Sequence, residues 1–174
     1  IAAGVRTGAI EAIIGEGVAV VRVMPNTPSL VGEGAAAVAG GRAASDEDIE
    51  WAAGILSAVG EVVVVPEALL DAVTGLSGSG PAYVFLLAEA LMDAGEAEGL
   101  PREVAVALTE QTLLGAATLL SRSDDPAATL RENVTSAGGT TAAGLAVFEA
   151  GGFRQLVSDV VAAATERSRQ LGAG

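Results

Sequence analysis

The pattern of apolar residues changes at Pro66, and this change constrains the fold more than any other feature of the chain. Before Pro66, short β-branched runs accompany one helical pattern, whereas every periodic segment after it has helical spacing. We therefore predict an α/β part over residues 1–65 and an all-α part over residues 66–174, with a chain that is mainly helical overall.

Three short apolar runs in the first part predict strands. They are Val18–Val23, Ala35–Ala39 and Val62–Val65, and the last is a run of valines typical of a strand buried on both faces. Ser45 followed by three acidic residues predicts the N-cap and first turn of a helix. Strands and helix in this order suit the edge of an α/β sheet, but they are too few for a complete domain.

The second part reads as a series of helices separated by glycine and proline. The predicted segments are Glu67–Thr74, Pro81–Glu98, Arg102–Ser121, a helix from Pro126 to about Val134, Thr140–Ala150 and Phe153–Leu171. Leu113–Leu120 is apolar nearly all round, which predicts burial against a second copy of the chain. A compact single bundle with a wide apolar face is the other interpretation that the periodicity leaves open.

The composition excludes several kinds of chemistry. The 174 residues include no Cys, His or Lys, so there is no Ser-His-Asp or Cys-His nucleophile, Lys Schiff base or His- or Cys-bound zinc. We expect no metal site. Disulfides are impossible, which removes any argument for an oxidising compartment and favours a cytoplasmic location.

The charge argues against polyanionic partners. The chain has 22 acidic residues against nine arginines, a net charge of −13, so we expect no nucleic-acid or membrane partner. No apolar run approaches the ~20 residues that span a bilayer, and no signal peptide is visible. The chain begins at Ile1 in the middle of a pattern, so we expect it to be part of a longer protein.

The first candidate motif is Met24-Pro25-Asn26-Thr27-Pro28, directly after a predicted strand. The two prolines bar a helix between them and would hold an amide and a hydroxyl rigidly at the carboxyl end of the strand. Open α/β sheets bind ligands at such ends. A stiff strand-exit turn without a ligand is the alternative.

The second motif is Gly75-Leu76-Ser77-Gly78-Ser79-Gly80-Pro81. Tyr83 stands where a dinucleotide-binding loop has its third glycine, and a predicted helix precedes the motif, so we do not interpret it as such a loop. It predicts a flexible hinge with hydroxyls and free amides at a helix start, which favours an anion. A sharp helix–helix turn whose glycines permit close crossing is the alternative.

The third motif, Thr135-Ser136-Ala137-Gly138-Gly139-Thr140-Thr141, lies between two predicted helices. Gly-Gly can form a concave nest of amides, and the helix that begins near Thr140 directs its free N–H groups the same way. Such a site could hold a carboxylate with neutral donors, although an ordinary N-capped helix start is the alternative. The three loops together favour a small anion and chemistry carried by a cofactor.

These motifs closely resemble those of the pyrroline-5-carboxylate reductase family, with Asp71–Tyr83, Asn133–Thr141 and Gly151-Gly152-Phe153-Arg154 in family order over essentially the whole chain. The resemblance implies a Rossmann NAD(P)-binding domain ending at residue 65 and a helical dimerisation and substrate-binding domain over 66–174. It implies hydride transfer from NADPH or NADH to the C=N bond of 1-pyrroline-5-carboxylate, giving L-proline, in a homodimer or a decamer.

The resemblance also implies site residues. Thr74 would be the catalytic hydroxyl donor near the imine nitrogen. The substrate carboxylate would be held by Ser136, Gly138, Gly139 and Thr141. The nicotinamide end would be lined by Ala3, Gly4, Met24, Pro25, Asn26 and Thr27.

Two features depart from the family pattern. Ala137 replaces a proline common in the third motif, which would loosen that loop, and the family's Gly-rich diphosphate loop is absent from the sequence. We therefore expect the chain alone to be inactive. A non-catalytic helical dimerisation or binding module is the alternative function.

Overall fold

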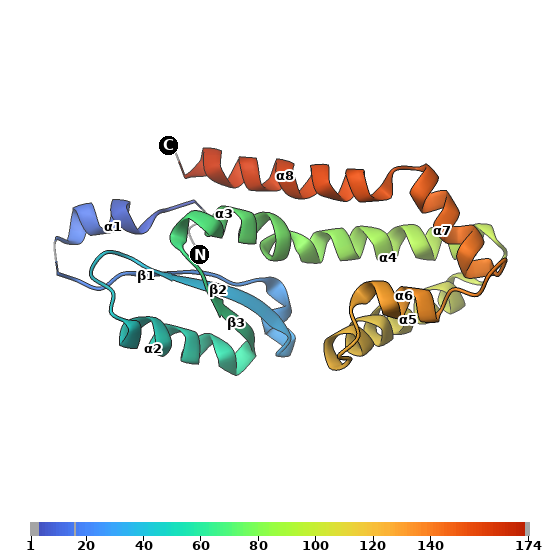
Figure 1. Ribbon diagram of the computed structural model, residues 1–174, viewed down its shortest axis with the longest axis horizontal. Coiled ribbons are helices and arrows are strands. Elements are labelled where there is room, and N and C mark those ends of the chain that lie inside the picture. Colours follow the sequence, from blue (N-terminus) through green and yellow to red (C-terminus); the bar gives the residue numbers. More distant parts are fainter. Residues whose placement is uncertain (1–3, 16, 173–174) are drawn as a thin grey trace. The chain divides into compact units, whose positions relative to one another are not determined.

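The computed structural model describes residues 4–15 and 17–172 (Figure 1). Two compact units make up the chain: Ile1–Ala82 with Val157–Gly174, and Tyr83–Leu156. The first unit contains a small sheet and the second only helices, which confirms the predicted fold class. The boundary predicted after residue 65 stays a prediction.

The predicted elements follow one another in the expected order, and one helix that was not predicted, α1, precedes them. The strands are β1 (Val21–Met24), β2 (Gly34–Gly40) and β3 (Gly60–Val64). The α-helices are α1 (Thr7–Ile14), α2 (Asp46–Leu56), α3 (Leu70–Val73), α4 (Gly80–Ala97), α5 (Arg102–Arg122), α6 (Ala127–Asn133), α7 (Thr140–Ala150) and α8 (Phe153–Leu171). Short helical turns are η1 (Thr27–Val31), η2 (Ser57–Val59), η3 (Glu67–Leu69) and η4 (Thr74–Gly78).

The sheet has the order β1-β2-β3, with β1 antiparallel and β3 parallel to the central strand β2. Alternate side chains of β2 face opposite layers. Ala37 and Ala39, at 0% and 1% exposure, contact Leu70 of α3 in the core. On the other face Gly40 lies against Ile49 of α2. Alanine and glycine in this strand therefore allow helices to pack closely on both faces (Figure 1).

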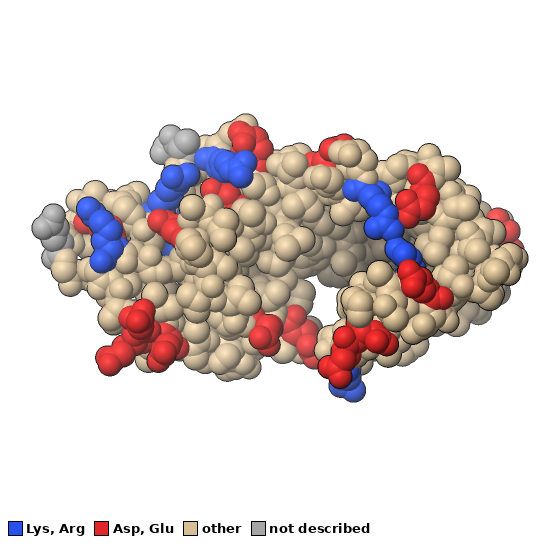
Figure 2. Space-filling model, in the orientation of Figure 1, with Lys and Arg blue, Asp and Glu red and all other residues tan. Residues whose placement is uncertain are grey.

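Helix α2 begins as its sequence predicts. The Ser45 hydroxyl accepts a hydrogen bond from the Asp48 backbone N–H, and the Asp48 carboxylate accepts one from the Ser45 N–H, which completes a capping box. The Asp48 pKa is lowered chiefly because the Ser45 hydroxyl donates a hydrogen bond to the Asp48 carboxylate at 2.7 Å, and further by the bond from the Ser45 N–H. The acidic first turn of α2 is visible as a red group in Figure 2.

The prediction that Val62–Val65 is buried on both faces is wrong. Val63 and Val64 are 51% and 61% exposed. Strand β3 lies at the edge of the described sheet and pairs only with β2, so its side chains lack the cover of a central strand.

Helix α5 is left largely uncovered by the rest of the chain, as expected for a helix that a second copy would cover, and it departs from expectation in one respect. Among its residues only Ala105 and Thr109 are buried within the chain, and Leu114 and Leu119 are more than half exposed. Its length and composition would also allow it to cross a membrane, contrary to our expectation that no segment qualifies. One such helix is weak support for a membrane location, because core helices of other proteins pass the same test.

Candidate functional site

The loop after β1 leads into the short 3₁₀ helix η1, which begins at Thr27, although the two prolines were expected to bar a helix between them. The side-chain amide of Asn26 in this loop is not free. Asn26 is extended, and its Oδ1 accepts a hydrogen bond from the Ala35 N–H at 2.9 Å. Its Nδ2 donates to the Ser77 carbonyl at 3.0 Å. The side chain therefore joins its own loop to strand β2, nine residues on, and to the turn η4, 51 residues on.

The segment after α3 is a π-helical turn, η4, and not the flexible break predicted from its glycines. The helical path bends only at Ser79, before α4 begins. A Cβ on the buried Gly75 would collide with the Thr165 hydroxyl and the Val161 carbonyl of α8. Gly75 therefore allows η4 and α8 to cross closely, which was the alternative interpretation of this motif. Single π-turns of this kind occur frequently at functional sites.

The Thr74 hydroxyl lies on this turn and is half-buried. It donates to the Leu70 carbonyl at 2.8 Å, and the Ser77 hydroxyl donates to the Val73 carbonyl at 3.1 Å. The Thr74 proton is thus engaged with the backbone, while its oxygen lone pairs can still accept a hydrogen bond.

The structure brings the first and second motifs together. Besides the Asn26–Ser77 bond, the Met24 methyl group lies so close to Gly78 that a Cβ there would be 2.5 Å from it. Pro25 is half-buried and Thr27 exposed beside them.

The predicted Gly4 lies apart from these contacts. It has a φ of 82° and packs against the backbone of Leu171 and Gly172. Ala3 lies outside the described residues.

The third motif connects α6 to α7 within the helical unit. Gly138 has a φ of 71°, a conformation that favours glycine. The Gly139 N–H donates to the Ser136 carbonyl at 3.0 Å, so this amide of the predicted nest is engaged within the turn. Ser136, Gly138 and Thr141 are exposed. The N–H groups in the first turn of α7 have no acceptor within the helix.

Two carboxylates that sequence reasoning missed anchor the first unit. Glu67 accepts hydrogen bonds from the Thr7 N–H at 2.7 Å and the Thr7 hydroxyl at 2.8 Å, and it pairs with Arg22 at 3.3 Å. The buried Asp71 accepts one from the Ser168 hydroxyl at 2.7 Å. Burial raises the Glu67 pKa, but the hydrogen bonds from Thr7 and Arg22 outweigh it and lower the pKa overall. Local sequence patterns do not predict these pairs, because Thr7 lies 60 residues from Glu67 and Ser168 lies 97 residues from Asp71 in the sequence.

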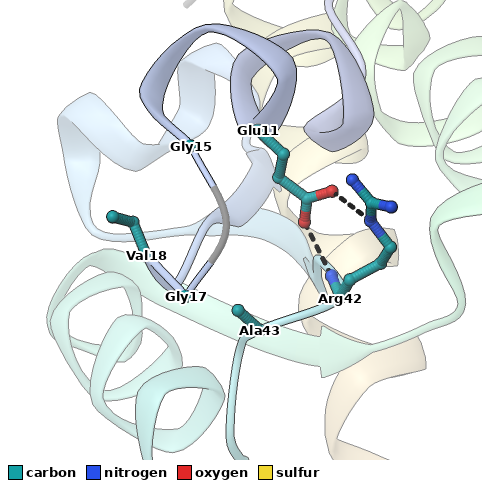
Figure 3. Close-up of a pocket in the computed structure, with 6 residues that line it drawn as sticks. All are labelled: Glu11, Gly15, Gly17, Val18, Arg42 and Ala43. Atoms are coloured by element: carbon teal, nitrogen blue, oxygen red, sulfur yellow. Dashed lines mark hydrogen bonds and ion pairs between the residues drawn. The ribbon is translucent and has the colours of Figure 1, made fainter.

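A pocket of about 240 Å³ adjoins a third such carboxylate (Figure 3). Glu11 Oε1 accepts from the Arg42 backbone N–H at 2.7 Å, and Oε2 accepts from Arg42 Nε at 2.9 Å. These Arg42 hydrogen bonds lower the Glu11 pKa. The pocket contains none of the predicted site residues, and among the described residues no acidic group is arranged to hold a metal.

The small sheet followed by an all-helical region defines the class that joins a Rossmann-like part to a helical domain. The family model described as pyrroline-5-carboxylate reductase dimerisation matches residues 67–171. The chain belongs to the pyrroline-5-carboxylate reductase family.

Similar proteins agree with this assignment. Pyrroline-5-carboxylate reductase of Arabidopsis thaliana is 47% identical over 171 residues, which cover 98% of this chain and 62% of that protein. The enzyme of the same name from Mycobacterium tuberculosis strain H37Rv is 46% identical over 188 residues, covering 98% and 64%. The chain therefore spans about six tenths of the length of these curated relatives.

Solved structures show the same fold. A pyrroline-5-carboxylate reductase from Coxiella burnetii has a TM-score of 0.93 and 42% identity, covering 97% of this chain and 63% of that one. Plasmodium falciparum pyrroline carboxylate reductase, with NADP bound, has a TM-score of 0.89 and 38% identity, covering 98% and 68%.

Proposed function

We propose that this chain serves a reductase that transfers hydride from NADPH or NADH to the C=N bond of 1-pyrroline-5-carboxylate, giving L-proline. The observation that carries the proposal is the contact between the first two motifs, in which Asn26 and Met24 meet the turn that bears Thr74. The likeness to proteins named for this activity supports it.

The cofactor would supply the hydride and bind with its nicotinamide end near the loop after β1. The exposed Thr27 and half-buried Pro25 fit a neighbour there, whereas the Asn26 amide is committed to protein partners. The loop after β1 therefore offers contacts for the nicotinamide end of the cofactor and for no other part of it.

Thr74 would act on the ring nitrogen as an acceptor. Because its proton is donated to Leu70, its lone pairs would accept the N–H of a protonated iminium. Protonation precedes hydride transfer in this scheme, so the hydride neutralises the iminium cation and no strong protein acid is needed. This reverses the donor role implied by the family resemblance.

The substrate carboxylate would bind at the start of α7. The exposed Ser136 and Thr141 hydroxyls and the first-turn amides are neutral donors at a positive helix end. Such donors hold a carboxylate without an arginine.

Mutation of these hydroxyls tests the assignment in the full-length enzyme. We expect Ser136→Ala or Thr141→Val to raise KM for pyrroline-5-carboxylate by about 10- to 150-fold, because a hydrogen bond to a charged group contributes about 1.5–3 kcal/mol. Thr135→Val is the matched control, because its hydroxyl already donates to the Arg131 carbonyl. Steady-state kinetics with unchanged KM in both site variants would refute the carboxylate site.

We propose that the enzyme is a cytoplasmic homodimer or a decamer of five dimers, with no nucleic-acid or membrane partner. The match to a dimerisation family and the exposed leucines of α5 support the dimer. Net negative charge supports the absence of polyanionic partners.

A non-catalytic helical module is the second candidate, favoured by the same apolar surface of α5. Fluorescence titration with NADPH distinguishes the reductase from the non-catalytic module. Saturable binding of NADPH by the chain alone would favour catalysis by this chain and would contradict the expectation that the chain alone is inactive.

A further inference from the structure

We propose that Asn26 is a positioning residue whose amide supplies the N–H that Pro81 cannot give to the Ser77 carbonyl, and so fixes the π-turn that orients Thr74. The inference rests on the proposed function for its link to catalysis. We call the two hydrogen bonds of the Asn26 amide, to Ser77 and to Ala35, the Asn26 clamp. The clamp rests on geometry alone, within one compact unit.

The need for an external donor follows from the sequence. In a regular helix the Ser77 carbonyl would accept the N–H of the residue four positions on, which is Pro81 and has none. The N–H of Ala82 donates instead to the Ser79 carbonyl at 3.0 Å. Asn26 Nδ2 approaches the Ser77 carbonyl at 3.0 Å and satisfies it from outside the helix.

The other end of the amide is anchored in the sheet. Asn26 Oδ1 accepts the Ala35 N–H at 2.9 Å, next to the start of the central strand. Ala35 in turn is in register with Glu61 of β3. Because the amide group is planar and bonded at both ends, it sets the separation between β2 and η4.

Two further contacts transmit this restraint to Thr74. The Met24 methyl group packs on Gly78. The Ser79 N–H closes the turn by donating to the Thr74 carbonyl at 2.8 Å. Ser77 and Thr74 lie on the same turn, so releasing the Ser77 carbonyl loosens the backbone that carries the Thr74 hydroxyl.

Hydrogen exchange on the full chain separates the two ends of the clamp. Asn26→Asp keeps an oxygen for the Ala35 N–H but cannot donate to Ser77. We expect unchanged protection at Ala35 and about tenfold faster exchange at the Ser79 amide, the factor for losing one hydrogen bond. Asn26→Ala should accelerate exchange at both amides.

Leu30→Ala is the control, because this side chain on the neighbouring turn η1 is 88% exposed. It should leave both amides protected. Unchanged exchange at Ser79 in Asn26→Ala would overturn the clamp, whatever reaction the protein catalyses.

Kinetics of the full-length enzyme test the catalytic link. Asn26→Asp should lower kcat with little change in KM for NADPH. A raised KM for NADPH at unchanged kcat would overturn the inference and make Asn26 a direct cofactor ligand. A wild-type enzyme without reductase activity would instead refute the proposed function, while the exchange results would still decide the clamp.

Discussion

Gly75 lies where the turn η4 crosses helix α8 at close range. The turn η4 passes α8 so tightly that there is no room for a methyl group between Gly75 and the backbone of Val161. A flexible side chain could move aside, but a backbone carbonyl within a helix cannot do so cheaply. Glycine is therefore favoured at this position because any side chain would collide with the backbone of α8.

We expect Gly75→Ala to destabilise the chain by about 1–3 kcal/mol, the usual cost of overpacking a well-filled contact. Gly54→Ala in α2 is the matched control, because a Cβ there meets nothing within 4 Å. In the control, the higher helix propensity of alanine should stabilise by about 0.5–1 kcal/mol. Urea denaturation measures both, and equal effects of the two substitutions would contradict the close crossing.

At the scale of elements, α1 is attached to the rest of its unit by carboxylates. Its first residue, Thr7, is held by Glu67, while Glu11 pairs with Arg42 beyond the end of β2. Both glutamates have lowered pKa values, for which the hydrogen bonds they accept are responsible. The ionised form is therefore favoured by folding.

Stability should consequently fall in acid. A lowered folded-state pKa contributes stability above the unfolded-state value of about 4.3, and that contribution is lost as the pH drops through the folded-state pKa. Glu67→Gln should reduce stability by about 1 kcal/mol at neutral pH, because a neutral acceptor replaces a charged one. It should also flatten the acid dependence.

Glu50→Gln on the exposed surface of α2 is the control and should leave the pH profile of the denaturation midpoint unchanged. A Glu67→Gln profile that parallels the wild type below pH 5 would contradict this role for Glu67.

The sequence predicts the elements that local signals determine. Ser45 and its acidic neighbours place the start of α2, and glycines bound α7 and α8 where the structure has them. The π-turn at Thr74 was missed because it depends on Asn26, 51 residues away from its partner Ser77. The exposure of Val63 was missed because β-branched composition cannot distinguish an edge strand from a central one.

At the scale of the whole molecule, α5 presents leucines that the chain itself does not cover. Leu114 and Leu119 are 62% and 55% exposed. Burial of one such side chain contributes about 1.5–3 kcal/mol, so several of them can drive association. The periodicity of Leu113–Leu120 predicted burial against a second copy and left a compact single bundle with a wide apolar face as the alternative. The exposure of these leucines favours the first interpretation.

We expect the chain to sediment as a dimer at micromolar concentration. Leu119→Asp should raise the dimer dissociation constant by at least about tenfold, because it removes apolar area and buries a charge. Leu114→Asp tests the same surface independently. Ile13→Asp on α1 is the control, since this side chain is 86% exposed and adds the same charge away from α5. A monomeric wild type, or dimers unaffected by either leucine substitution, would refute α5 as the contact, because a buried carboxylate cannot be accommodated at an interface without a cost in affinity.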